Sequence, residues 1–182
     1  MNIFVLCTGR CGSTTFYKAC SHIDNYTSAH ESRSSLICPE HFNYPLNHIE
    51  VDNRLSWFLG KLDDNYGDDA FYVHLKRDIL ATAQSFLKRW DYGIIGAYSR
   101  QIIMGQMRKL PFENSLDVCI DYCETVNSNI NLFLKDKNKK MIFLLENADK
   151  DFKIFWDRIH ADGNFNLALS EWKIPYNASH DG

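Results

Sequence analysis

A short segment near the start of the chain combines residue types that bind anions. Residues 8–15 read TGRCGSTT, between an apolar stretch at residues 2–7, typical of a buried strand, and a predicted helix at residues 13–23. A strand, a glycine-containing turn and a helix start together direct backbone N–H groups and the positive end of a helix dipole toward one point. We therefore expect the segment to bind a phosphate or a similar anion. An ordinary strand-to-helix turn that merely needs glycine is the alternative.

Common phosphate-binding motifs do not fit this segment. Thr14 and Thr15 stand where a Walker A loop has its second glycine and its lysine, so ATP-type phosphoryl transfer loses its strongest support. The glycine spacing also differs from the dinucleotide fingerprint. Neither Cys7 nor Cys11 is followed at the required spacing by the arginine of a cysteine phosphatase loop. The sequence thus predicts an anion site of another kind.

A second candidate site lies at the segment HLKRDILATAQSFLKRW. Arg77 follows a predicted strand at residues 70–75, and Asp78 is placed to cap the helix predicted after it. Ser85 comes eight residues after Arg77, and on a helix it lies within about 20° of Asp78, away from the apolar stripe. Arg77 and Ser85 can therefore face one ligand. The alternative is an Arg77–Asp78 pair with a solvated serine.

The two segments together resemble the sulfotransferases that use 3′-phosphoadenosine 5′-phosphosulfate (PAPS). The resemblance covers about residues 1–90, and FLLEN at residues 143–147 is similar to a later strand of that family. It implies that Arg77 and Ser85 hold the 3′-phosphate and that no metal is required. It also implies that the 5′-phosphosulfate is held by Gly9, Arg10, Cys11, Gly12, Ser13, Thr14 and Thr15. The chain departs from the family in lacking a glycine-rich basic loop near its C-terminus, and in carrying Arg10 and Cys11 where lysine and serine are frequent.

Sulfuryl transfer also needs charge stabilisation and a proton acceptor. Arg10 is the candidate for stabilising the charge that develops on the oxygens. The predicted second strand, residues 26–30, ends in SAHESR, which supplies His30 and Glu31 as candidate bases. If both are extended they point to opposite faces, so only one reaches the acceptor. The resemblance to carbohydrate-modifying and bacterial members favours Glu31. The acceptor itself, a small molecule or a carbohydrate, cannot be identified from the sequence.

The remaining periodicity predicts an α/β fold. Strands alternating with helices indicate a three-layer sandwich with a central parallel sheet and a P-loop-like strand–loop–helix, in a single domain over residues 1–182. The segment HIEVDNRLSWFLGKL at residues 48–62 is most simply an amphipathic helix that packs on the core. A fourth strand is expected at residues 141–145. Further helices are expected at residues 53–62, 79–90, 94–108 and 116–134, with a final helical region that reaches Trp172.

Composition limits the partners and the location. The formal net charge of −3 gives no global basic field for nucleic acid or an anionic membrane. The six cysteines form no CxxC pair, which favours a reduced, cytoplasmic setting, and no apolar stretch is long enough for a membrane span. Cys119 and Cys123 share a helical face but lack a second pair of ligands, so no metal is expected. The oligomeric state is left open.

Two other functions stay open at this point. A nucleotide or small-molecule kinase of P-loop-like fold is disfavoured by the absent Walker lysine. A non-catalytic nucleotide-binding protein would keep the anion site without turnover. A preference for adenosine 3′,5′-bisphosphate, the product of PAPS, over ATP separates the sulfotransferase from the kinase. Measurable sulfate transfer separates it from the non-catalytic protein.

Overall fold

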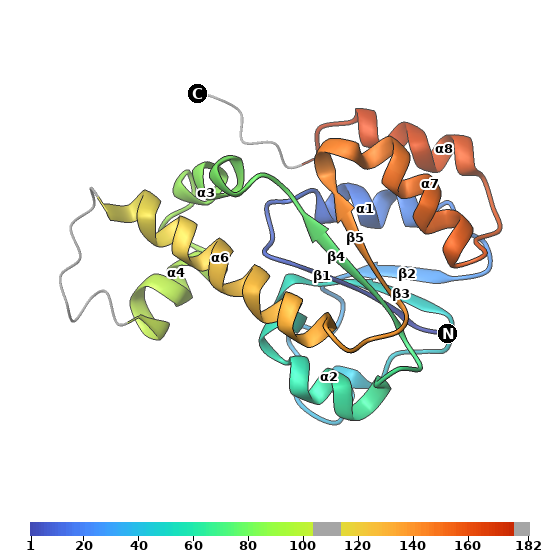
Figure 1. Cartoon of the computed structure of the whole chain (residues 1–182), viewed down its shortest axis with the longest axis horizontal. Coiled ribbons are helices and arrows are strands. Elements are labelled where there is room, and N and C mark those ends of the chain that lie inside the picture. Colours follow the sequence, from blue (N-terminus) through green and yellow to red (C-terminus); the bar gives the residue numbers. More distant parts are fainter. Residues whose placement is uncertain (104–113, 177–182) are drawn as a thin grey trace.

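A computed structural model describes residues 1–103 and 114–176 of the chain. At its centre is a five-stranded sheet in the order β2-β3-β1-β4-β5, with every neighbouring pair parallel (Figure 1). The strands are β1 (Ile3–Cys7), β2 (Thr27–His30), β3 (His48–Val51), β4 (Phe71–Lys76) and β5 (Lys140–Leu144). The predicted α/β class with a parallel sheet is confirmed.

Helices cover both faces of this sheet (Figure 1). The helices are α1 (Ser13–Cys20), α2 (Leu59–Tyr66), α3 (Ile79–Leu87), α4 (Gly93–Ala97), α6 (Ser115–Leu134), α7 (Ala148–Arg158) and α8 (Phe165–Ser170). A π-helical turn, Tyr98–Ile102, continues α4. Shorter 3₁₀ turns occur at Glu40–Phe42, Asn53–Trp57, Leu145–Asn147 and Glu171–Lys173. This arrangement is compatible with the predicted three-layer sandwich.

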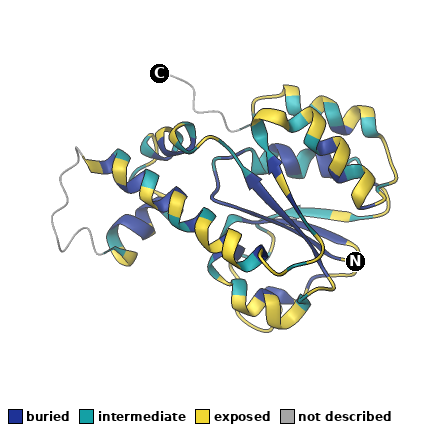
Figure 2. Cartoon of the chain, in the orientation of Figure 1, coloured by how far each residue is buried: buried dark blue, intermediate teal, exposed yellow. Residues whose placement is uncertain are grey.

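Strand β1 is buried on both faces, as its continuous apolar sequence predicts (Figure 2). Ile3, Val5 and Cys7 belong to a core cluster shared with α1, α7 and α8. Phe4 and Leu6 point to the opposite face and join a second cluster with α3 and α6. Successive side chains of a strand alternate between faces, so one short strand contributes to both cores. These contacts fix β1 in the middle of the sheet.

The structure corrects the sequence prediction for residues 48–62. His48–Val51 is strand β3, paired with β1 and β2, where an amphipathic helix was expected. The predicted helix at residues 53–62 is a 3₁₀ turn, Asn53–Trp57, followed by α2. The apolar pattern does not indicate strand β3, because two of its four residues, His48 and Glu50, are polar although they are buried. Nε2 of His48 lies 3.0 Å from Oε2 of Glu50, so the two side chains bond to each other.

The helix predicted at residues 94–108 is found only in part. It corresponds to α4 and the π-helical turn Tyr98–Ile102, and residues 104–108 lie outside the described residues. The other predicted elements are confirmed within a few residues. Helix α6 and strands β2, β4 and β5 in particular lie within one residue of their expected bounds.

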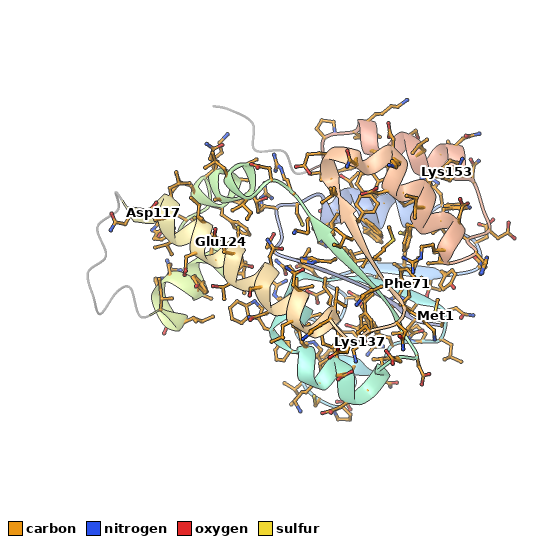
Figure 3. The ribbon with its side chains drawn as sticks, viewed as in Figure 1. Met1, Phe71, Asp117, Glu124, Lys137 and Lys153 are labelled. Atoms are coloured by element: carbon orange, nitrogen blue, oxygen red, sulfur yellow. The ribbon has the colours of Figure 1, made fainter. Side chains whose placement is uncertain are left out.

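The sheet topology determines where a ligand can bind. Met1 and Phe71, labelled in Figure 3, mark the amino edge of the sheet, since Ile3 of β1 pairs with Phe71 of β4. At the opposite, carboxyl edge, β1 has β3 on one side and β4 on the other, because the chain passes from one side of β1 to the other on its way from β3 to β4. Ligands of open parallel sheets bind at such a reversal of strand order. The loop after β1 is located there.

Candidate functional site

The loop between β1 and α1 has a backbone conformation that glycine favours. Gly9 and Gly12 have φ of 82° and 90°, and Arg10, with φ of 57°, is also left-handed. A Cβ atom at Gly9 would lie 2.6 Å from Nδ2 of Asn53, so a side chain there would clash. Holding a non-glycine residue such as Arg10 in this conformation costs on the order of 1 kcal/mol, and residues strained in this way cluster at functional sites.

The start of α1 is open to an anion. Gly12 occupies the N-cap position and makes no side-chain capping bond, and no acidic residue stands in the first turn. Among the described residues, the first-turn residues Ser13, Thr14 and Thr15 line a pocket beside this helix end. The backbone N–H groups of a first turn lack partners within the helix and carry the positive end of its dipole. These features are compatible with the predicted anion site.

The second predicted segment lies against this loop. Nε of Arg10 donates a hydrogen bond to Oγ of Ser85 at 3.0 Å. Nη1 of Arg77 donates to the backbone carbonyl of Arg10 at 3.1 Å. Asp78 caps α3 as expected, with its carboxylate accepting from the N–H of Ala81 at 2.8 Å. Residues far apart in the sequence are thus brought to one site.

Positive charge is concentrated around Arg10. Partial burial lowers the pKa of Arg10, and the positive charges of Arg89 and Arg77 lower it further. Guanidinium groups close enough to disfavour one another's charge are stabilised by a bound anion. The positive charges of the site and the backbone geometry of the loop would therefore both favour a bound anion.

A pocket of about 510 Å³ lies over these groups, a volume in the range of small-molecule sites. Part of its lining is polar and cationic, formed by Arg10, Arg77, Ser85, Gln84 and Lys88 together with the first turn of α1. The rest of the lining is largely apolar. It consists mainly of Leu145, Trp172, Ile174, Pro175 and Tyr176.

Not every predicted loop residue lines the pocket with a side chain. Cys11 is buried in the core cluster beneath the loop, so only its backbone can serve the ligand. Its thiol lies beside that of Cys7, and a hydrogen bond between the two, together with donors from Thr8 and the backbone, lowers the pKa of Cys11. Gly9 acts through its conformation alone.

The two candidate bases have different surroundings. Nε2 of His30 lies 3.2 Å from Oγ of Ser13, at the start of α1. Glu31 has a φ of 51°, so the two residues are not both extended as the sequence prediction assumed. Its carboxylate accepts a hydrogen bond from Arg54 at 2.5 Å. Burial lowers the pKa of His30, which keeps its imidazole neutral.

A buried carboxyl group beside these residues was missed by the sequence reasoning. Asp52 follows β3 and is fully buried, and its Oδ1 accepts from the N–H of Arg54 at 2.7 Å. Burial raises the pKa of Asp52 to about 7, and the negative charges of Glu31 and Glu50 add to the effect. Because β3 was not predicted, nothing in the sequence placed Asp52 at the carboxyl edge of the sheet.

Several pocket residues were also missed. Lys88 lies three positions after Ser85 on the turn that ends α3, so helical spacing could have indicated it. The wall formed by Trp172 to Tyr176 carries no recognisable motif. Its position depends on the packing of the Trp172 ring against Phe16 and Phe143, with ring centroids 5.8 and 5.1 Å apart. Such long-range contacts are not readable from local sequence.

Comparison with known proteins adds no family assignment: no protein-family model, curated protein or solved structure matches the chain. Within residues 1–103 and 114–176, no group of three or more histidine, cysteine, aspartate or glutamate side chains is arranged to hold a metal ion. No helix in these described parts has the length and apolar character that a membrane crossing requires. The function must therefore be argued from the site.

Proposed function

We propose that the chain is a sulfotransferase of P-loop-like fold that transfers a sulfuryl group from PAPS to a hydroxyl or amine acceptor. The observation that carries the proposal is the hydrogen bond from Arg10 to Ser85. It joins the anion-binding loop to the helix that follows Arg77, so two anion-binding features share one pocket. A ligand that carries more than one anionic group, such as PAPS, can contact both features in this pocket.

The pocket residues fit the two anionic ends of PAPS. The first turn of α1 and Arg10 would hold the 5′-phosphosulfate, through backbone N–H groups, hydroxyls and a guanidinium. Arg77 and Ser85 would hold the 3′-phosphate. The lowered pKa of Arg10 supports this assignment, because a bound anion would relieve its repulsion with Arg77 and Arg89.

The chemistry follows from the charges that must be stabilised. PAPS supplies a sulfuryl group, whose bond to a phosphate oxygen breaks as the acceptor oxygen or nitrogen bonds to sulfur. Negative charge then grows on the departing phosphate. In this proposal Arg10 and the N–H groups of α1 are the donors to that charge, and preorganised donors of this kind each contribute on the order of 3 kcal/mol. The products are the sulfated acceptor and adenosine 3′,5′-bisphosphate.

We assign His30 as the base that takes the acceptor proton. Its imidazole touches Ser13 at the start of α1, where the sulfuryl group would lie, and its lowered pKa keeps it neutral and able to accept a proton. Glu31, which the sequence reasoning favoured, has its carboxylate bonded to Arg54. In this assignment Glu31 and Arg54 position the turn that follows His30.

Incubation with PAPS tests this function. The protein is mixed with PAPS and with pools of sugars, phenols and amines, and mass spectrometry follows the gain of one SO₃ by an acceptor together with release of adenosine 3′,5′-bisphosphate. Transfer to any pool supports the proposal. Transfer of phosphate from ATP instead would identify a kinase. Tight binding of adenosine 3′,5′-bisphosphate without transfer to any pool would identify a non-catalytic binding protein.

A further inference from the structure

Much of the apolar lining of the pocket comes from one segment near the C-terminus. After α8, the chain makes the 3₁₀ turn Glu171–Lys173 and runs on to Tyr176, so that Trp172, Ile174 and Tyr176 face the same pocket as Arg10. Ile174 is 45% exposed, although it is a large apolar side chain that borders a cavity. Apolar side chains beside a few polar groups in the wall of a cavity are typical of small-molecule sites.

A chain of hydrogen bonds holds this segment in place. Nε2 of His22 lies 2.8 Å from Oε1 of Glu171, and the hydroxyl of Tyr176 donates to Oε2 of the same carboxylate at 2.5 Å. His22 follows the end of α1, and the 3₁₀ turn packs on that helix. The hydrogen bonds from His22 and Tyr176 lower the pKa of Glu171, so the carboxylate is ionised at neutral pH. Helix α1 thus presents its start to the anion and supports the apolar wall near its end.

We propose that the segment from Trp172 to Tyr176 is the nucleobase subsite of this pocket, and that Glu171 is a positioning residue that holds it through His22 and Tyr176. The inference rests on the proposed function, since it assumes that the ligand of this pocket is a nucleotide. Flat base rings bind well against aromatic and apolar side chains, because every base has an apolar face. Tyr176 and Ile174 provide such a surface, and the cationic groups line the same cavity.

Two ligands that differ only in the base test the subsite. Calorimetry compares adenosine 3′,5′-bisphosphate with 1-deoxyribose 3,5-bisphosphate, which keeps both phosphates and has no base. For the unaltered chain we expect the base to improve affinity on the order of 10- to 100-fold. In the double variant Ile174→Ala/Tyr176→Ala the ratio of the affinities for the two ligands should fall to nearly one. The affinity for the base-free ligand should be retained. Tyr92→Ala, which removes a 77% exposed tyrosine elsewhere on the chain, should leave the ratio unchanged.

Variants of Glu171 test the positioning role. Glu171→Ala removes both hydrogen bonds and should reduce the ratio without changing the affinity for the base-free ligand. Glu171→Gln can still donate to His22 and accept from Tyr176, so it should restore most of the ratio. A general loss of stability would weaken the binding of both ligands equally, and Glu171→Gln would not restore a base preference. Equal loss for both ligands would overturn the role of Glu171.

The outcomes separate this inference from the proposed function. If the two ligands bind equally to the unaltered chain, or if the ratio survives in the double variant, the base does not lie on this segment, while the phosphate site stands. If neither ligand binds, both the inference and the proposed function are overturned. Sulfuryl transfer from PAPS with an unaltered base preference in the double variant would overturn the inference alone.

Discussion

Nε of Arg10 donates a hydrogen bond to Oγ of Ser85 at 3.0 Å, although 75 positions separate the two residues. The bond connects the loop after β1 to helix α3, and Arg77 reinforces it by donating to the backbone carbonyl of Arg10. Strands β1 and β4 are direct neighbours in the sheet, so their carboxyl ends bring the two segments together. The proximity of the two segments is therefore a consequence of the strand order as much as of either motif.

Arg77 is expected to discriminate ligands by their 3′-phosphate. Removing that phosphate, by replacing adenosine 3′,5′-bisphosphate with adenosine 5′-phosphate, should weaken binding by about 2 kcal/mol, because a ribose hydroxyl cannot replace the charged contact. In Arg77→Ala the two ligands should bind alike. Lys153→Ala, which removes an exposed charge on α7 (Figure 3), should keep the full difference. Calorimetry that finds the full difference in Arg77→Ala as well would remove Arg77 from the site.

His30 is expected to limit the rate of transfer without affecting nucleotide binding. His30→Asn should lower kcat by about 10²–10⁴-fold, the usual contribution of a general base. Glu31→Gln should lower kcat much less, because it only weakens the bond to Arg54. Since the base acts when unprotonated, the rate should fall as the pH drops through the lowered pKa of His30, below 6.5. A near-normal kcat in His30→Asn, with Glu31→Gln inactive at unchanged nucleotide affinity, would show that Glu31 is the base and His30 is not.

Asp52 is expected to make stability depend on pH. Its pKa rises from 3.8 to about 7 in the folded chain, so between these values the folded state binds more protons than the unfolded state. The stability due to the protonated carboxyl is thus fully present below pH 3.8 and is lost as the pH rises through about 7. The loss should be on the order of 2–4 kcal/mol.

Asp52→Asn isolates this effect, because asparagine keeps an oxygen to accept from Arg54 and does not ionise. Urea unfolding is measured at several pH values between about 4 and 8, an interval that includes the raised pKa. The free energy of unfolding of the unaltered chain should decrease over this interval, and that of the variant should not. Asp64→Asn, at an exposed position on α2, should retain the decrease. Parallel curves for Asp52→Asn and the unaltered chain would show that Asp52 ionises normally.

Most of the fold could be predicted because its elements carry strong local signals. Strand β1 is a continuous apolar run, and α6 repeats its apolar residues at helical spacing. Strand β3 could not be predicted, because His48 and Glu50 interrupt its apolar residues and are stabilised in the core by their mutual bond. Such a pair becomes favourable only after the neighbouring strands have formed.

The cationic residues that line the pocket could be singled out from the sequence, and the apolar ones could not. Arg10, Arg77 and Ser85 were found from residue type and spacing, since phosphate-binding chemistry restricts both. The wall at Trp172 to Tyr176 is positioned by packing against α1 and by the carboxylate of Glu171, and neither depends on a local pattern. The left-handed backbone of Glu31, which breaks the alternation assumed for a strand, could not be predicted from the local sequence either.

Turnover of PAPS by Arg10→Ala tests the central claim most directly. The release of adenosine 3′,5′-bisphosphate in the presence of a sulfated acceptor is measured for Arg10→Ala, for Lys153→Ala and for the unaltered chain, with thermal unfolding to confirm that each variant is folded. We predict that Arg10→Ala loses about 10²–10³-fold in kcat, because a preorganised charged donor is removed from the developing negative charge, and that Lys153→Ala is unchanged. Undiminished turnover in a folded Arg10→Ala variant would contradict the account.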